Sequence, residues 1–173
     1  MSKWQWAQLV GFYGFWLLAV MGQNSLAWLL GVLILAHFMF TPSRADDVKV
    51  LSLSLLGIAV DGVLTFWGVF AFNQWPIWLA LLWVGFVLTL DHSLGWLAAR
   101  PVWQQALLGA ISGPSSYLSG WRLGAVELPF GPWLTLVILV PVWALLLVIL
   151  VRLDTLIRSK CYGEKKCYGE KNS

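Results

Sequence analysis

Five ionisable or imidazole side chains lie inside long apolar runs of the sequence: His37, Asp61, Asp91, His92 and Arg122. An ionisable group at the depth of a bilayer costs at least about 2–3 kcal/mol unless it is paired or hydrated. Imidazoles in such a setting can relay protons, and a guanidinium can bind a carboxylate or a lipid phosphate. These side chains are therefore the first candidates for function.

The composition of the chain places these groups in a membrane protein. Of its 173 residues, 60% are hydrophobic and 11% are charged, which is typical of a multi-pass membrane protein. The length allows one helical bundle and no additional soluble domain. We expect residues 1–153 to form a single transmembrane domain.

Six apolar runs predict an all-α, polytopic transmembrane helical bundle, because helices satisfy their own backbone groups in lipid. The first two runs are short. They either span a thin membrane or form a re-entrant hairpin that turns at residues 22–25. The six runs are Trp6–Met21, Ser25–Phe40, Val48–Phe72, Trp75–Leu97, Trp103–Trp121 and Gly131–Leu153.

Basic residues between the runs predict the orientation of the bundle. Arg44 and Lys49 lie between the second and third runs, and Arg100 lies between the fourth and fifth. The connections on the other side, at residues 22–25 and 73–74, carry no base. The positive-inside rule therefore predicts that both the N and the C terminus are cytoplasmic.

Residues 154–173 are expected to form a basic cytoplasmic tail. The tail contains the sequence KCYGEK twice, at Lys160–Lys165 and Lys166–Lys171, which is typical of a small duplication. Its bases favour contact with anionic membrane lipids. We expect no nucleic-acid partner, because the rest of the chain has no basic patch interleaved with aromatics.

The third run carries small and polar residues on one helical face. Asp61 shares this face with Ser54, Gly57, Thr65 and Gly68, because their spacings are three or four residues. One interpretation is a packing seam in which a neighbouring helix donates a hydrogen bond to Asp61. The other is a carboxylate that binds protons or substrate near the membrane centre. The sequence leaves both open.

The fourth run ends with the adjacent pair Asp91 and His92. Neighbouring positions diverge by about 100° around a helix, so the two side chains face different partners. His92 is suited to proton relay, because the ordinary pKa of an imidazole lies near physiological pH. The alternative is a structural pair, with each member bonded to a different helix.

The fifth run is the most polar, and its candidate residues are Ser112, Pro114, Ser116 and Tyr117. Pro114 is expected to break or kink the helix, because it cannot donate a backbone hydrogen bond. The freed backbone groups then face protein or water, which predicts an interior cavity. A new half-helix starting there would present its N-terminus to an anionic or carbonyl oxygen. The alternative is a kink that only shapes the bundle.

Arg122 lies on the side of the membrane that otherwise lacks bases. A lipid phosphate or a carboxylate is the expected partner that holds it there. His37, near the inner end of the second run, is interpreted as an interfacial residue. The chain shows no phosphate-binding glycine loop and no pair of histidines at metal-binding spacing, so no metal and no cofactor are expected and an enzyme is disfavoured.

Two sequence motifs resemble a known family. They are DHSLGWL at Asp91–Leu97 and GPSSYLSGWRLGA at Gly113–Ala125. On these motifs the chain resembles a family of small bacterial inner-membrane proteins known as domain of unknown function 2878, over roughly residues 5–155 of this sequence. The resemblance implies a multi-pass protein of the bacterial inner (cytoplasmic) membrane. It implies no activity, although members look as if they accompany lipid-modifying genes, including ones similar to cyclopropane-fatty-acid synthases.

The leading hypothesis is a protein that binds a lipid or acyl chain, or that scaffolds lipid-modifying enzymes. Its cavity would lie beside Pro114 and be lined by Asp61, His92, Tyr117 and Arg122. The alternative is a small proton-coupled transporter in which Asp61 and His92 titrate, and such a short chain would then need to form a homodimer. A membrane-embedded enzyme is the third hypothesis.

Overall fold

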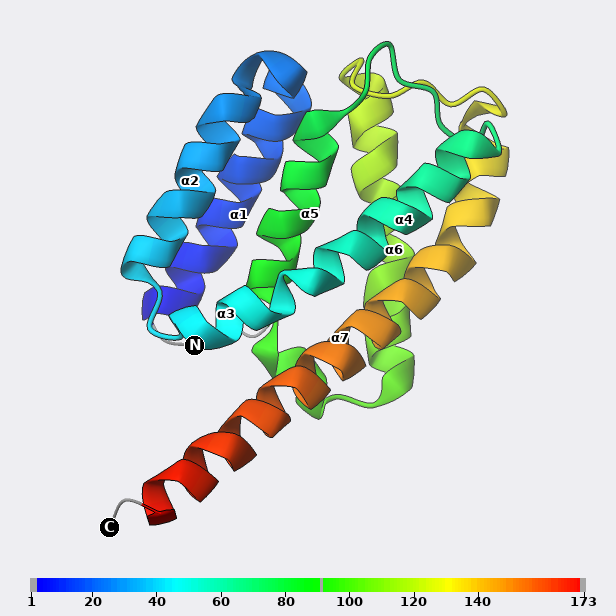
Figure 1. Ribbon diagram of the computed structural model, residues 1–173. Helices are drawn as coiled ribbons and strands as arrows, with labels where there is room; N and C mark the ends of the chain where they lie inside the picture. The colour runs from blue at the N-terminus through cyan, green and yellow to red at the C-terminus, as the bar shows by residue number, and fades with distance from the viewer. Residues whose placement is uncertain (1–2, 91, 172–173) are drawn as a thin grey trace.

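The computed structural model describes the backbone of residues 3–90 and 92–171, and the side chains of residues 6–90 and 92–159. Helices account for most of the described chain, and the described residues contain no named strand. Ala71 and Glu127 form an isolated antiparallel β-bridge between two loops. The predicted all-α class is therefore confirmed (Figure 1).

The first two helices form an antiparallel hairpin. Helix α1 covers Lys3–Gly22 and α2 covers Ala27–Phe40, with a short 3-10 helix, η1, over Gln23–Leu26. Gln23 has a φ of 45°, a left-handed conformation that allows the chain to reverse. Figure 1 shows α1 and α2 side by side, with α5 packed against them.

The third and fourth apolar runs form shorter helices than expected. Helix α3 covers Arg44–Val50, α4 covers Ser52–Phe66, and α5 covers Ile77–Thr89, followed by the 3-10 helix η2 over Gly95–Ala99. Gly68 has a φ of 75°, so the chain leaves the right-handed helix soon after Phe66. Figure 1 shows α4 crossing the bundle obliquely, in front of α6.

Helices α6, Val102–Arg122, and α7, Gly131–Lys171, form the most extensive helix pair. Two glycines let them approach closely. A Cβ atom at Gly113 would overlap the Trp143 ring, and one at Gly109 would overlap the Trp143 carbonyl oxygen. Small residues at such contacts are what membrane helix pairs use in place of a hydrophobic driving force.

The break expected at Pro114 is absent. Helix α6 runs without interruption through Pro114, so no second half-helix begins there and no helix N-terminus is presented to a ligand. The close packing of α6 on α7 supports the helix through this point, and Ser115 donates its hydroxyl to the Ile111 carbonyl beside it. Helix α7 continues past residue 154 into the predicted basic tail.

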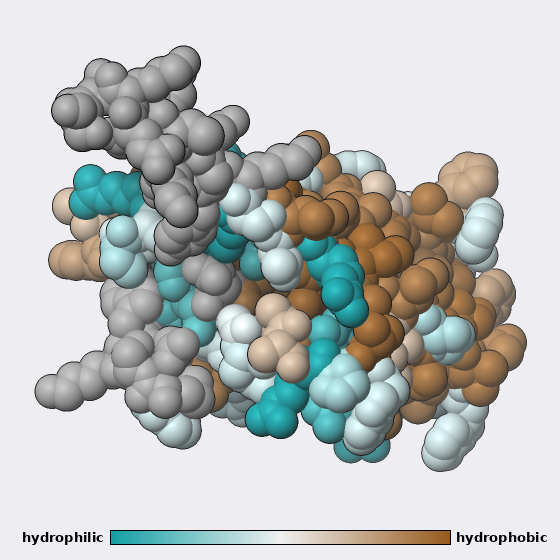
Figure 2. All heavy atoms as spheres, turned by 90° about the horizontal axis from the view of Figure 1, so that it is seen from below, coloured by the Kyte–Doolittle hydropathy of each residue, from teal (hydrophilic) through white to brown (hydrophobic). Residues whose placement is uncertain are grey.

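Three helical stretches have the length and hydropathy of a membrane crossing: residues 44–66, residues 131–159, and residues 6–40, which fold back on themselves as the α1–α2 hairpin. Ile77–Thr89 is a shorter apolar helix. Many large apolar side chains face outward, including Trp28, Leu35, Phe66, Trp133 and Val137. Figure 2 shows the molecule from below, with hydrophilic side chains gathered on one part of this face and a broad hydrophobic area beside them. The chain is therefore an all-helical membrane protein, whereas the predicted count of six crossings stays a prediction.

Candidate functional site

Asp61 lies at the centre of the first buried polar cluster. It is only 4% exposed, and its Oδ2 accepts hydrogen bonds from Trp83 Nε1 and from the Tyr117 hydroxyl, both at 2.6 Å. One oxygen therefore joins α4, α5 and α6. Oδ1 is buried and accepts no hydrogen bond from any described residue. Neutral aromatic donors thus hold the carboxyl group in place.

Aromatic packing fixes the two donors. Gly57, one turn before Asp61, lets Trp83 lie directly on α4, since a Cβ there would overlap the indole. Trp83 stacks on Trp143 with ring centroids 5.2 Å apart, and Tyr117 stacks on Phe70 at 4.4 Å. Such offset ring pairs contribute about 0.5–1.5 kcal/mol each beyond burial. The packing-seam interpretation of the third run therefore describes this part of the structure.

A cavity of about 410 Å³ lies beside this cluster, between α1, α5 and α6. Its walls are mostly aromatic and aliphatic, and Trp16 Nε1 donates to Ser116 Oγ across it at 2.7 Å. Leu9 and Tyr13 line the cavity and are also exposed, so the cavity opens on the α1 side of the bundle. Other lining residues are Leu82, Trp83, Phe86, Ser112, Tyr117 and Trp143.

The chemistry of this cavity suits an apolar ligand with one polar group. Pockets of about 300–1,000 Å³ with apolar walls and a few polar groups are typical small-molecule sites. Trp143 lines the cavity, and its buried Nε1 donates to no described residue. Asp61 itself is outside the lining and acts by positioning Trp83 and Tyr117.

A second buried cluster lies where the ends of α2 and α5 meet α3. Asp47 of α3 is fully buried, and its Oδ2 is 3.2 Å from His37 Nε2 and 3.3 Å from His92 Nε2. The Thr41 hydroxyl donates to the same oxygen at 2.6 Å. The two imidazole rings have centroids 5.6 Å apart. Gln8 of α1 reaches His37 Nδ1 with its side-chain amide at 2.8 Å.

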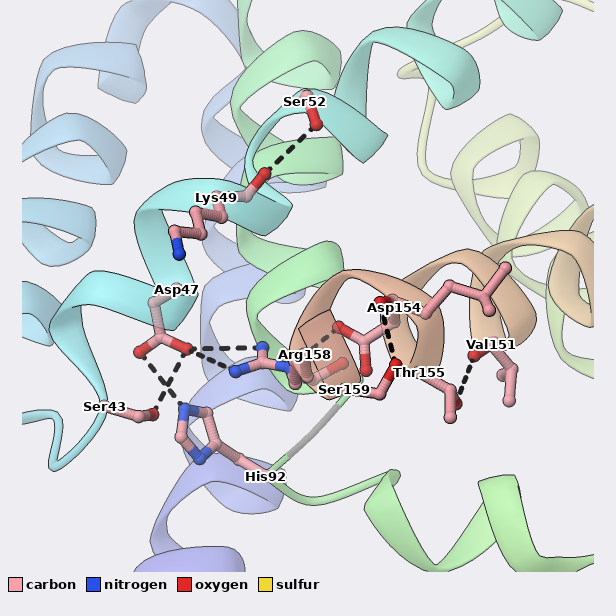
Figure 3. Close-up of polar contacts among 12 residues, drawn as sticks. Ser43, Asp47, Lys49, Ser52, His92, Val151, Asp154, Thr155, Arg158 and Ser159 are labelled. Atoms are coloured by element: carbon pink, nitrogen blue, oxygen red, sulfur yellow. Dashed lines mark hydrogen bonds and ion pairs between the residues drawn. The ribbon is translucent and has the colours of Figure 1, made fainter. Parts of the chain in front are cut away.

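Helix α7 joins this second cluster through Arg158. Its guanidinium lies 3.4 Å from Asp47 Oδ1, and its Nε donates to Asp154 Oδ1 at 3.0 Å (Figure 3). Asp154 and Arg158 are one helical turn apart, which is the spacing at which such side chains meet. Because both ends of the pair are buried, the whole arrangement is far less screened than a surface ion pair.

The structure divides the candidates that the sequence placed around one cavity. Asp61 and Tyr117 lie together, and Ser112, Ser116 and Tyr117 line the cavity, beside the buried Pro114. His92 belongs instead to the Asp47 cluster, and Arg122 is exposed at the end of α6 and lines neither site. Asp91 lies outside the described residues.

The sequence did not identify Asp47 or Arg158 as candidate site residues. Asp47 lies between the second and third predicted runs and Arg158 lies in the predicted tail, yet both side chains are buried. The Asp154–Arg158 spacing was a usable signal for an internal pair. His37 and His92 are 55 positions apart, so only the fold reveals that they face one carboxylate.

Fold and hydropathy together define an all-helical membrane protein with two buried polar clusters. The model of one protein family, described as "Protein of unknown function (DUF2878)", matches residues 5–149. The chain belongs to this family, which confirms the resemblance carried by the two motifs. No curated protein and no solved structure matches the chain.

Proposed function

We propose that this protein binds an acyl chain or a lipid in the cavity between α1, α5 and α6. The observation that carries the proposal is the cavity itself, which combines about 410 Å³ of largely apolar space with buried polar groups in its wall. A saturated or unsaturated hydrocarbon chain needs apolar walls, and its carbonyl or hydroxyl oxygen needs a fixed donor. The cavity lining includes the hydroxyl-bearing side chains Ser112 and Ser116, which can supply such a donor.

The position of the opening supports a ligand that arrives through the membrane. The exposed rim residues Leu9 and Tyr13 lie on α1, and Ser112 and Ser115 lie on α6. Lateral access between two helices lets a lipid enter without leaving the hydrocarbon layer. The Trp16–Ser116 hydrogen bond crosses this route and limits how far the two helices separate.

The setting that we propose is the bacterial inner membrane, crossed about six times, with both termini cytoplasmic. The start of α1, helix α3 and the end of α7 lie toward the same end of the molecule in Figure 1. Arg44, Lys49 and Arg100 are all exposed, as cytoplasmic bases next to anionic lipid should be. A C-terminal green fluorescent protein fusion should fluoresce, whereas a C-terminal alkaline phosphatase fusion should be inactive.

The experiment that tests ligand binding is native mass spectrometry of mildly solubilised protein, with lipid extraction from the same sample. Ser116→Phe places a ring in the cavity and should abolish a lipid adduct present in the wild type. Ile111→Phe is the matched control, because Ile111 is exposed on α6 and does not line the cavity. Equal adducts in both variants, or none in the wild type, would remove the proposal.

One related role and one competing function also remain to be tested. A membrane protein that binds a lipid can present it to a lipid-modifying enzyme, and crosslinking in native membranes should then recover that enzyme. Proton-coupled transport by a homodimer is the weaker proposal, because Asp61 and His92 contact different partners. Proton-driven uptake into proteoliposomes that disappears in Asp61→Asn would favour transport instead.

A further inference from the structure

We propose that His37, Asp47 and His92 bind one divalent transition-metal ion of the zinc class. The three side chains come from α2, α3 and the segment after α5, and each offers one ligand atom. One ring nitrogen of His37, one ring nitrogen of His92 and an Asp47 carboxylate oxygen all lie within 4.8 Å of one another. The site is separate from the acyl-chain cavity, so this inference is independent of the proposed function.

The spacing of these atoms matches a coordination sphere. Zinc–nitrogen and zinc–oxygen bonds of about 2.0–2.1 Å in a tetrahedron place neighbouring ligand atoms about 3.3 Å apart. The two measured nitrogen-to-oxygen separations are 3.2 and 3.3 Å. Ordinary N–H···O hydrogen bonds are shorter, about 2.9–3.0 Å. Both separations are at the long end of the hydrogen-bond range and fit the ligand spacing of an ion bound between the three atoms.

Hydrogen bonding alone leaves the carboxylate oxygen crowded. Oδ2 of Asp47 would accept from Thr41, His37 and His92 together, although a carboxylate oxygen offers about two lone-pair positions. A metal ion removes this conflict, because it occupies one position while Thr41 retains the other. Two neutral imidazoles and one carboxylate form a nitrogen-rich donor set that suits zinc better than magnesium or calcium.

The surroundings supply the contacts that orient metal ligands. Gln8 lies 2.8 Å from His37 Nδ1, so its amide can fix the ring with Nε2 directed at Asp47. Amide oxygen and nitrogen are interchangeable in such an assignment, and the oxygen accepts the Nδ1 proton when Nε2 binds metal. Arg158 contacts Oδ1, the carboxylate oxygen that is not part of the proposed site.

Charge in the cluster also favours a cation. The Asp47 carboxylate is one of the three ligand groups and supplies negative charge, while both histidines bind a metal as neutral imidazoles. With three protein ligands, the ion keeps a fourth position for water or another small ligand. A smaller cavity of about 270 Å³ reaches His37 from the α1–α2–α5 side and offers a route to that position.

The test is metal binding by the full-length protein in detergent. The starting chain carries Cys161→Ser and Cys167→Ser, so that the two thiols of the repeat cannot bind metal themselves. After chelator treatment, the protein is titrated with Zn²⁺ and Co²⁺, and bound metal is measured by mass spectrometry after desalting. We expect one equivalent per chain and, with Co²⁺, the visible absorption bands of a tetrahedral site.

Two glutamine variants separate ligation from hydrogen bonding. His37→Gln and His92→Gln each retain a hydrogen-bond donor for Asp47 but supply a poor metal ligand, so each should lose the bound equivalent. Asp154→Asn is the matched control, because Asp154 pairs with Arg158 and is not one of the three proposed ligands. It should retain the metal.

A thermal-unfolding measurement covers the case in which a variant fails to fold. Zn²⁺ should raise the Tm of the thiol-free starting chain and chelator should lower it, since a ligand that binds only the folded state stabilises it. A chain that binds no stoichiometric metal and shows a metal-independent Tm would overturn the proposal. Retention of the full equivalent by both folded glutamine variants would do the same.

Discussion

The two buried aspartates of this protein, Asp61 and Asp47, have opposite surroundings. Asp61 accepts hydrogen bonds from the neutral Trp83 indole and Tyr117 hydroxyl, within an aromatic core. Asp47 faces two imidazoles and a guanidinium. Neutral donors make Asp61 a local anchor for the cavity wall, whereas ionic partners make Asp47 the junction of four segments. The residue type alone therefore does not decide what a buried carboxylate does.

The largest effect is expected at Asp47. Asp47→Asn removes one of the two carboxylates that Arg158 contacts, and because Asp154 still pairs with Arg158, the loss should lie below the about 3–5 kcal/mol of a fully broken buried ion pair. We expect a corresponding loss in the free energy of unfolding, measured by denaturant titration in detergent. A loss below about 1 kcal/mol would show that water already compensates these charges.

A smaller effect is expected at Asp61. Asp61→Asn retains one carbonyl oxygen for Trp83 or Tyr117 but brings an amide into a site built of donors. An unsatisfied buried polar group costs about 1–3 kcal/mol, so the loss in unfolding free energy should fall below that of Asp47→Asn. The same measurement in both variants tests the contrast directly, and a reversed order would contradict it.

Both polar clusters depend on the position of α7, so a substitution at the α6–α7 contact should affect both of them. Gly113→Ala forces a Cβ into the Trp143 ring, and overpacking of this kind costs about 1–3 kcal/mol. Gly62→Ala is the matched control, because a Cβ there meets no atom within 4 Å and the helix gains rigidity. We expect Gly113→Ala to lower the Tm and Gly62→Ala to leave it unchanged or higher.

The smallest effect is expected at the mouth of the cavity. Trp16→Phe removes the hydrogen bond to Ser116 but keeps most of the ring, so it should cost about 0.5–1.5 kcal/mol. Trp28→Phe, at an exposed position of α2, serves as the control. Native mass spectrometry should show a changed lipid occupancy only in Trp16→Phe, and identical occupancy in both would separate Trp16 from ligand access.

Hydropathy predicted the helical class, and it placed the two ends of the fifth run accurately. The fifth run was expected at Trp103–Trp121 and α6 covers Val102–Arg122. The third and fourth runs were expected to be longer than α4 and α5. An apolar loop is indistinguishable from an apolar helix by hydropathy, and Gly68 was read as part of a helical face although it lies beyond the helix end.

Pro114 illustrates the limit of a local rule. Proline removes one backbone donor, and this predicted an interruption. The helix nevertheless runs through Pro114, in a segment that packs closely against α7. Local chemistry predicts that the missing hydrogen bond weakens the helix, whereas tertiary packing determines whether the helix continues through the proline.

The sequence by itself determined that this chain is an all-helical membrane protein, that it belongs to its family, and that Asp61 and Tyr117 are functional candidates. Only the tertiary structure decided that His37, Asp47, His92 and Arg158 form one cluster and that Arg122 lies outside it. The physical reason is the separation along the sequence between the residues that make contact. Periodicity reports which residues share a face within one helix, whereas these contacts join residues 10 to 111 positions apart, through the packing of separate helices.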